Sequence, residues 1–242
     1  MQTIAANWSA PKNIRALSTT RDGGVSQGHY AGLNLGDHVN DDSDAVITNR
    51  QMLRQELTLP NDPSWLNQTH STNCVILDHP NASRDADAAI THDPQQVLAI
   101  LTADCLPIVL CNRQGTEIAA IHAGWRGLAN GIIEATLEDM QSAPKDCLAW
   151  IGPAICGPCY ATGAEVLDQF TAQYSFAIQA FQCIEQQWYA DLPKLADLIL
   201  TTSGITAVYS SNVCTLENTH LYSYRRAAQT GRIATLIWFQ NT

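Results

Sequence analysis

The stretch LAILTADCLPIVLCNRQGTEIAAIHAGWRG, residues 98–127, indicates how the chain folds. It contains three apolar runs rich in β-branched residues. Runs of about four to eight such residues, bounded by polar residues or glycine, are typical of buried strands. Cys105 lies between the first two runs, which places it at a strand edge or in a tight loop. The third run, residues 117–121, leads to His122 at the end of a strand.

The residues that follow His122, Ala-Gly-Trp-Arg-Gly, are predicted to open a helix. Its apolar residues fall on one face of that helix, and they are Leu128, Ile132, Leu137 and Met140. Reactive groups at strand ends beside a helix N-terminus are common in the sites of α/β proteins. The stretch therefore predicts either a functional site at Cys105 and His122 or a thiol and an imidazole that only pack in the core.

Length and composition are those of a globular protein. The 242 residues are 45% hydrophobic, and length alone favours neither one domain nor two. No apolar run approaches the roughly 20 residues that a membrane-spanning helix needs. The N-terminal residues lack the apolar core and cleavage pattern of a signal peptide. We therefore expect no membrane partner and a cytoplasmic location.

The net charge of −10, with only three lysines, argues against a polyanionic partner. Such a surface repels nucleic acid and acidic membranes, so we expect no nucleic-acid partner. A small anion can still be held by two or three arginines. The chain has eight cysteines, several of them inside strand-like runs. Without a secretion signal, a chain of this size is expected to keep them reduced.

Other segments carry clear signals for individual elements. Strands are predicted over residues 13–18, over 73–77, near 207 and over 233–239. Asp41 to Asp44 supply capping residues for a helix with Val46, Arg50, Leu53 and Leu57 on one face. Further helices are predicted over residues 164–174 and after Asp191, where Pro193 is tolerated in the first turn. No repeat or linker divides the chain, so we predict a single domain over residues 1–242.

His70, Cys105 and His122 form a candidate metal site, because each is predicted at a strand junction. Two imidazoles and a thiolate with an open fourth position are the arrangement of catalytic zinc, whereas structural zinc is closed by four protein ligands. The three residues are far apart in the sequence. Spacing alone therefore does not separate this ligand set from core packing.

Seven segments, in order along the chain, resemble one known family. They are TRDGGVS (20–26), LNLGDHV (33–39), QTHS (68–71), TADCLP (102–107), HAGWRG (122–127), IGPAI (151–155), and SYRR (223–226) with TGR (230–232). The family is known as the laccase-domain or multicopper polyphenol oxidase family, and also as the zinc-dependent purine nucleoside phosphorylases. The resemblance extends from about residue 18 to residue 238.

This resemblance implies a fold, a metal and an activity. The fold is a single α/β domain, a mixed β-sheet sandwich flanked by helices, similar to cysteine hydrolases of the cytotoxic necrotising factor type. The metal is zinc, bound by His70, Cys105 and His122. The activity is cleavage of adenosine, inosine, guanosine or methylthioadenosine with phosphate, and adenosine deamination as a second reaction. The implied partners are purine nucleosides and phosphate, and the oligomeric state is left open.

Several polar residues in these segments are candidates for holding the substrate. Arg126 lies near the start of the helix after His122, where free N–H groups, the helix dipole and the guanidinium together favour phosphate. Arg21, Asn34 and Arg50 are further candidates for binding phosphate or ribose. The simpler alternative for each arginine is a structural ion pair.

Other functions fit the same residues. Cys105, activated by His122, would be the nucleophile of an amide hydrolase. A zinc-stabilised binding protein would use the metal only to hold its fold. A copper-dependent polyphenol oxidase would use the His₂Cys trio, which is also a blue-copper ligand set. Asp104 is a candidate proton carrier or partner of a metal ligand, and its alternative is a loop-capping carboxylate.

Zinc is the expected metal, and copper is the weaker candidate. Blue-copper sites add a weak methionine ligand, whereas the three methionines, at positions 1, 52 and 140, lie outside the motifs. True laccases bind several coppers with more histidines than the seven present in this chain.

The tetrapeptide Cys156-Gly-Pro-Cys159 is that of thioredoxin-like active sites, and it stands where the family has Gly-Pro-x-Cys. Nothing else in the chain resembles the small thioredoxin fold, so we predict that it is not a redox centre. The family's acidic residue after the paired arginines is replaced by Ala227, and no role is transferred to that position.

Overall fold

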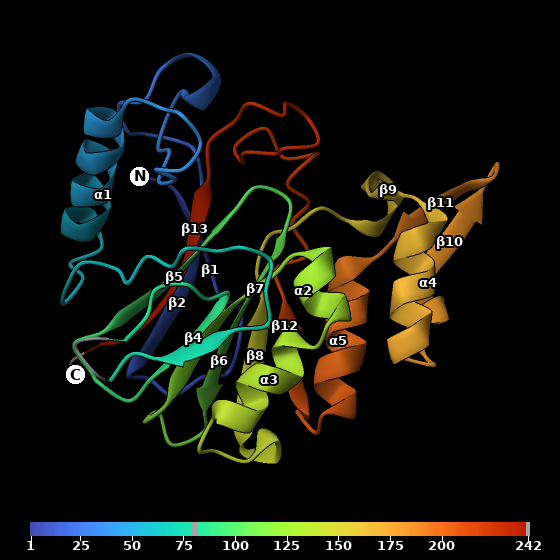
Figure 1. Cartoon of the computed structure of the whole chain (residues 1–242). Coiled ribbons are helices and arrows are strands. Elements are labelled where there is room, and N and C mark those ends of the chain that lie inside the picture. The colour runs from blue at the N-terminus through green and yellow to red at the C-terminus, as the bar shows by residue number, and fades with distance from the viewer. Residues whose placement is uncertain (79–81, 241–242) are drawn as a thin grey trace.

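Two stacked sheets form the centre of the molecule in the computed structural model, which describes residues 1–78 and 82–240 (Figure 1). The first sheet is antiparallel, with the order β1 (Thr3–Ala5), β2 (Ile14–Thr19), β13 (Ile233–Phe239) and β5 (Val97–Thr102). The second is mixed, with the order β12 (Ala207–Ser210), β8 (Cys147–Ile151), β6 (Leu106–Asn112), β7 (Ile118–Ala123), β4 (Ala88–Thr91) and β3 (Cys74–Ile76).

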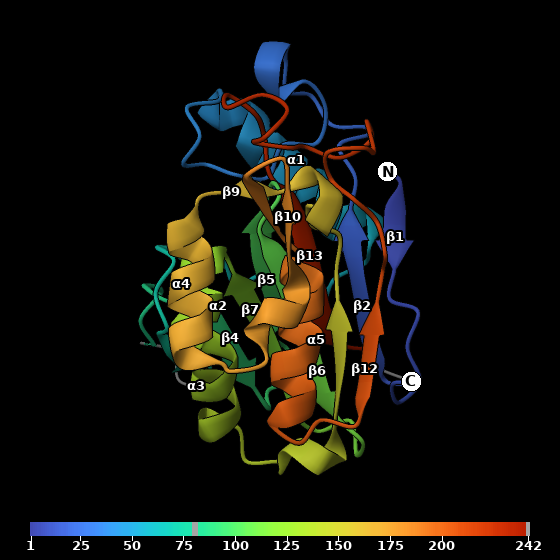
Figure 2. The same ribbon diagram turned by 90° about the vertical axis from the view of Figure 1, so that its right-hand side faces the viewer.

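Helices cover the outer faces of both sheets. One helix, α1 (Ser43–Glu56), packs on the first sheet. Three helices lie over the second sheet: α2 (Trp125–Ala129), α3 (Ile132–Asp139) and α5 (Leu192–Thr202). A fourth, α4 (Ala164–Gln173), packs against α2 farther from the sheet, and Figures 1 and 2 show all four on the same side. A small third sheet lies beside α4, with the order β10 (Phe181–Ile184), β11 (Gln187–Ala190) and β9 (Ala161–Thr162). Short 3-10 turns complete the chain: η1 (Gly28–Tyr30), η2 (Pro144–Asp146), η3 (Gly157–Cys159) and η4 (Ala177–Ala180).

The central strands are buried on both faces, which explains their continuous apolar sequence. Neighbouring residues of a strand point to opposite faces. On β6, Val109 therefore packs between the two sheets, together with Ile100 and Ile237 of the first sheet. Its neighbours Ile108 and Leu110 pack under the helices. The result is a four-layer arrangement of helix, sheet, sheet and helices, so the predicted α/β sandwich flanked by helices is confirmed.

Most predicted elements lie where the sequence placed them, and their caps are those predicted. The Asp42 carboxylate accepts hydrogen bonds from two backbone N–H groups at the start of α1. Asp191 accepts one from the Lys194 N–H at the start of α5, where Pro193 occupies the first turn. The continuous helix predicted after His122 is wrong. Gly131, with a φ of 92°, separates α2 from α3, because this left-handed conformation interrupts a right-handed helix.

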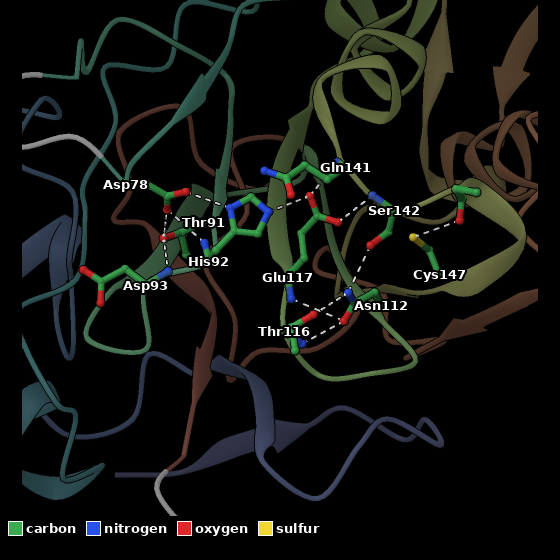
Figure 3. A network of polar contacts seen from close by, with 11 residues as sticks. Asp78, Thr91, His92, Asp93, Asn112, Thr116, Glu117, Gln141, Ser142 and Cys147 are labelled. Carbon is green, nitrogen blue, oxygen red and sulfur yellow. Dashed lines mark hydrogen bonds and ion pairs between the residues drawn. The ribbon is translucent and has the colours of Figure 1, made fainter.

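A buried polar network lies at the start of β7, at the opposite end of the strand from His122 (Figure 3). The Glu117 carboxylate, directly before β7, is 1% exposed and accepts the backbone N–H groups of Gln141 and Ser142. His92 bridges it to Asp78, with its ring nitrogens 3.1 Å from Glu117 Oε1 and 2.7 Å from Asp78 Oδ2. These partners offset the cost of burying the carboxylate.

No helix among the described residues is long and apolar enough to cross a membrane.

Candidate metal centre and its cavity

Strand pairing brings Cys105 next to His122. The loop of residues 103–105 carries the chain from β5 in the first sheet to β6 in the second. In the antiparallel pairing of β6 with β7, Pro107 lies opposite His122 and Leu106 opposite Ala123. Cys105 directly precedes β6, so it lies beside the C-terminal end of β7. The two residues predicted at strand ends are therefore neighbours.

Asp87 joins the same end of the sheet through β4. In the pairing of β4 with β7, Ala88 lies opposite Ile121, so the residue before β4 lies beside His122. The Asp87 side chain is fully buried, and its Oδ1 lies 2.7 Å from His122 Nδ1. The His122 N–H donates to the Asp87 carbonyl at 2.7 Å. Asp87 therefore fixes both the backbone and the imidazole of His122.

The same carboxylate also positions His70. It accepts the backbone N–H groups of Thr69, His70 and Ser71, at 3.1, 3.0 and 2.6 Å. His70 has a φ of 63°, a left-handed conformation that is uncommon for a residue other than glycine. Three hydrogen bonds to one buried carboxylate stabilise this conformation. As a result, the His70 ring lies at the site, its Nε2 3.7 Å from Cys105 Sγ.

Gly124 leaves the space that the His70 ring occupies. A Cβ atom at this position would lie 2.4 Å from His70 Cδ2 and 3.4 Å from Cys105 Sγ. Its φ of −61° is open to any residue. Glycine is therefore required here for space and not for backbone conformation.

The three side chains fit a metal ion. One ligand atom from each of His70, Cys105 and His122 lies within 4.8 Å of the other two. Because His122 Nδ1 contacts Asp87, its Nε2 is left for a metal, as in many sites where a carboxylate orients a histidine ligand. A thiolate with imidazoles suits zinc or copper better than calcium or magnesium.

The charges of these groups support each other. Burial alone would raise the pKa of the Cys105 thiol, but hydrogen bonds to His122 and His70 outweigh it and lower the pKa to about 6. Burial would lower the pKa of His122, but Asp87 and Cys105 outweigh it and raise the pKa to about 9. Burial also opposes the charge on Asp87, but His122 and Ser71 outweigh it, so the pKa of Asp87 lies well below its usual range. Without a metal, a thiolate therefore faces an imidazolium at neutral pH.

The site opens into a cavity of about 430 Å³. The positively charged residues of its wall are Arg126, Arg225 and Arg232. Aromatic rings of Trp125, Tyr160 and Tyr224 line it as well. The guanidinium of Arg225 lies 5.0 Å from the centre of the Tyr160 ring. A cavity with arginines and aromatic rings beside a metal-ligand group suits a small anionic and aromatic ligand.

Comparisons with known proteins give this chain a family. Residues 15–240 match the family model described as multi-copper polyphenol oxidoreductase laccase. The chain belongs to this family. A Haemophilus influenzae protein named purine nucleoside phosphorylase is 45% identical, covering 99% of this chain and 100% of the relative. The Escherichia coli purine nucleoside phosphorylase YfiH is 43% identical, covering 97% and 98%.

Solved structures of similar proteins share the fold. A Neisseria meningitidis protein of 42% identity superposes with a TM-score of 0.94, with both chains fully covered. YlmD from Geobacillus stearothermophilus, at 29% identity, gives a TM-score of 0.87 over 95% of this chain and 93% of the other. The resemblance of the sequence to the laccase family is therefore confirmed over its whole length.

Of the substrate candidates in this laccase-family chain, Arg126 lies in the cavity wall and three others lie outside it. Arg21 donates to the Ala31 carbonyl. Arg50 donates to the Leu35 carbonyl and pairs with Asp37 at 3.2 Å. Asn34 is fully buried, and its Oδ1 accepts the N–H of Arg232. In the structure, these three side chains hold the residue 21–41 loop. Because α2 has only five residues, its dipole adds less at Arg126 than the sequence suggested.

Asp104 lines the cavity, but its carboxylate already has three donors. It accepts the hydroxyls of Thr215 at 2.6 Å and Ser223 at 3.1 Å, and the N–H of Arg225 at 2.7 Å. Its φ is 92°, so these contacts hold a left-handed turn directly before Cys105. The contacts are those of the loop-capping alternative.

Asp87, Arg225 and Arg232 are site residues that the sequence alone did not identify. Arg225 and Arg232 stand in the SYRR and TGR segments, which carried the family resemblance without a role for each residue. Asp87 had a weaker signal, an acidic residue directly before a short apolar run. A carboxylate at that position faces a neighbouring strand, and only the pairing of β4 with β7 identifies that neighbour as His122.

Proposed function

We propose that this chain is a zinc-dependent purine nucleoside phosphorylase whose metal is bound by His70, Cys105 and His122. One observation carries the proposal: the metal-ligand group opens into a cavity lined by three arginines. A phosphorylase must hold phosphate beside the bond that it breaks, and arginines bind phosphate in bidentate fashion. The names of the Haemophilus influenzae and Escherichia coli relatives support the same activity.

Zinc fits this site better than copper. Blue-copper sites add a weak axial methionine, and none of the described residues that line the cavity is a methionine. The His122–Asp87 contact matches the carboxylate that commonly orients a zinc-bound histidine. Zinc supplies a Lewis acid that polarises a substrate oxygen without redox chemistry. The metal bound at this site in the purified protein tests this choice: one zinc that Cys105→Ser removes is expected, and intense blue absorption from copper–thiolate bonding contradicts it.

In phosphorolysis, phosphate attacks the anomeric carbon of ribose while the purine base departs. Arg126, Arg225 and Arg232 would bind the phosphate oxygens and balance their charge. The rings of Tyr160 and Tyr224 would pack against the purine, because aromatic faces favour stacking. Burial raises the pKa of Tyr160 to about 12, so its hydroxyl stays neutral and can donate a hydrogen bond.

Asp104 would act as a positioning residue. With both oxygens occupied by donors, it has little capacity to carry a proton and instead fixes the turn that presents Cys105. Adenosine deamination, the second reaction, would use the same cavity with water in place of phosphate. Phosphate dependence therefore distinguishes the two reactions.

The decisive experiment follows products chromatographically with zinc-loaded protein. Adenosine or inosine should yield free base and ribose 1-phosphate only when phosphate is present, whereas adenosine should become inosine without it. Base release that is unchanged in phosphate-free buffer would mean hydrolysis. His122→Ala should abolish both reactions, because the metal is lost.

Arg126→Ala tests the anion site. Charge-assisted hydrogen bonds are worth about 1.5–3 kcal/mol, so the KM for phosphate should rise roughly 10- to 100-fold while deamination changes less. Arg54→Ala is the matched control, because Arg54 is exposed and pairs with Asp62 outside the cavity. Equal losses in both reactions would place Arg126 outside the phosphate site.

The cysteine-hydrolase alternative rests on the lowered pKa of Cys105 beside His122, which is also what a nucleophile requires. The fold similarity to cysteine hydrolases of the cytotoxic necrotising factor type stays a prediction. Amide hydrolysis by chelator-treated protein, blocked by thiol alkylation, would favour this function. Zinc-loaded protein that turns over neither nucleosides nor amides, yet unfolds at lower temperature without metal, would favour a binding protein.

A further inference from the structure

We infer that Cys156, Cys159 and Cys214, with Glu217 as the fourth ligand, form a second metal site that binds a soft divalent cation such as zinc. This site is separate from the one proposed for catalysis. The three sulfur atoms lie within 4.8 Å of one another. Among the described residues, only two groups of three potential metal ligands lie this close together, and this is the second. The three ligand cysteines are partly buried and have free thiols.

Backbone pairing brings the two cysteine-bearing segments together. Cys156 is the N-cap of η3 after β8, and Cys159 is the last residue of η3. Cys214 follows β12, which pairs with β8 in parallel. The pairing continues beyond the strands as a bridge between Ala154 and Cys214. The Thr215 N–H donates to the Ala154 carbonyl at 3.0 Å. The sulfurs are therefore held together by the main chain, whether or not a metal is bound.

The ligand geometry is close to that of a tetrahedral site. A Zn–S distance of about 2.3 Å places the sulfurs of such a site roughly 3.8 Å apart, so small side-chain rotations from the present positions suffice. The Cys-x-x-Cys spacing of Cys156 and Cys159 is that of many structural zinc sites. Glu217 Oε1 lies 3.7 Å from Cys159 Sγ and offers the fourth ligand.

A backbone donor favours a negatively charged sulfur at Cys214. The Cys156 N–H points at Cys214 Sγ, 3.4 Å away, and such N–H donors stabilise a thiolate. By contrast, Cys111 and Cys147 are completely buried in the apolar core and behave as packing residues. Among the described residues, the three cysteines belong to none of the apolar core clusters, so packing does not explain why three thiols converge here.

A metal here would fasten the wall of the catalytic cavity. The segments that it joins both hold Asp104: the Ile155 N–H donates to its carbonyl at 3.1 Å, and the Thr215 hydroxyl to its carboxylate at 2.6 Å. Asp104 in turn precedes Cys105. A site closed by four protein ligands is structural, so its loss should lower thermal stability more than turnover.

Counting zinc per chain tests the inference. Protein purified without chelators and dialysed against trace zinc should hold two zinc ions. Cys214→Ser and Cys105→Ser should each hold one, and the double variant none. Cys183→Ser is the matched control, because Cys183 is an exposed free thiol outside both sites, and it should hold two. Cys105→Ser removes a ligand of the first site only, and Cys214→Ser removes a ligand of the second site only. The zinc counts of the two variants therefore show separately whether each site binds metal.

A second measurement does not depend on any variant folding. In wild-type protein, bound zinc should protect Cys105 from alkylation and, in addition, the three cluster thiols. Peptide mass spectrometry before and after chelation counts the protected thiols. Glu217→Gln should retain three protected thiols but bind zinc more weakly. Wild-type protein that holds a single zinc, or Cys214→Ser that still holds two, overturns the inference. A disulfide between two of the cluster cysteines in freshly purified protein also overturns it.

Discussion

Replacing Gly124 with alanine is expected to displace His70 from the metal centre while leaving the backbone unchanged. Gly124 is the N-cap of α2, with φ and ψ of −61° and 156°, a conformation that alanine adopts readily. The added methyl group would lie 2.4 Å from His70 Cδ2 and 3.0 Å from its Nε2. The substitution therefore acts on the ligand through space alone.

The size of the effect follows from these distances. Ordinary carbon contacts begin near 3.4 Å, so the ring must withdraw by about 1 Å. Metal–ligand distances vary by only about 0.2 Å in genuine sites, so His70 would no longer bind the metal. We expect the metal Kd to rise at least 100-fold, which is about 2.7 kcal/mol. The unfolding free energy of the metal-free protein should change much less, because the His70 side chain is exposed.

Competition with a chromophoric chelator measures this Kd. Gly163→Ala is the matched control, because Gly163 is also a helix N-cap with a negative φ of −77° and extended ψ. The atoms nearest to its added methyl group would be those of the flexible Glu165 carboxylate, so its metal affinity should match wild type. His70→Ala should weaken binding about as much as Gly124→Ala, and the double variant should lose little more, since both changes remove one ligand.

Wild-type affinity in Gly124→Ala would refute this reasoning. It would mean either that His70 does not bind the metal or that the residue 69–71 loop shifts without cost. Full additivity of the two substitutions would likewise show that Gly124 acts through something other than His70.

The other predictions concern the surroundings of the site. Asp87→Asn should weaken metal binding roughly 10- to 100-fold, because the amide orients His122 poorly, and chelator competition measures it. In metal-free protein, the depressed pKa of Asp87 contributes stability above its unfolded pKa of about 4, and this is lost as pH falls. Denaturant unfolding across pH should therefore show a shallower acid-side decline in Asp87→Asn than in wild type. Serine at both Cys156 and Cys159 should leave nucleoside turnover within a few-fold of wild type, and a loss of a hundredfold in folded, metal-loaded protein would contradict this. Trp150→Ala should cost about 3–5 kcal/mol in urea unfolding, because Trp150 is fully buried between the sheets and donates to Asn7 at 2.8 Å. A cost below about 1 kcal/mol would mean that the two sheets repack without it.

The sequence predicted well what depends on local pattern. The strands around Cys105, the helix capped by Asp42 and the helix capped by Asp191 each follow from apolar periodicity and side-chain capping. The small sheet of β9, β10 and β11 was missed, because its strands are short and partly exposed and carry no strong period. The break at Gly131 was missed because the apolar spacing continues through it.

The candidate site was predictable only in part. His70, Cys105 and His122 stood at recognisable strand junctions, and the family resemblance grouped them. What local pattern cannot give is strand register. The pairing of β4 with β7 puts Asp87 against His122, and a shift of one residue would remove it. The positions of Arg225 and Arg232 in the cavity wall likewise depend on long-range loop packing.

His70 is the residue that separates the two chemistries this site resembles. Cys105, His122 and Asp87 have the order of nucleophile, base and orienting carboxylate that a hydrolase needs. The same order serves a metal site, because Asp87 fixes Nδ1 and leaves Nε2 for the metal. A hydrolase has no need of a second imidazole. Yet His70 has a φ of 63°, and its backbone N–H donates to the Asp87 carboxylate. The absence of a side chain at Gly124 leaves space for the His70 ring. Backbone strain kept for one side chain indicates that the side chain is used, and the proposed metal centre would use it as a third ligand.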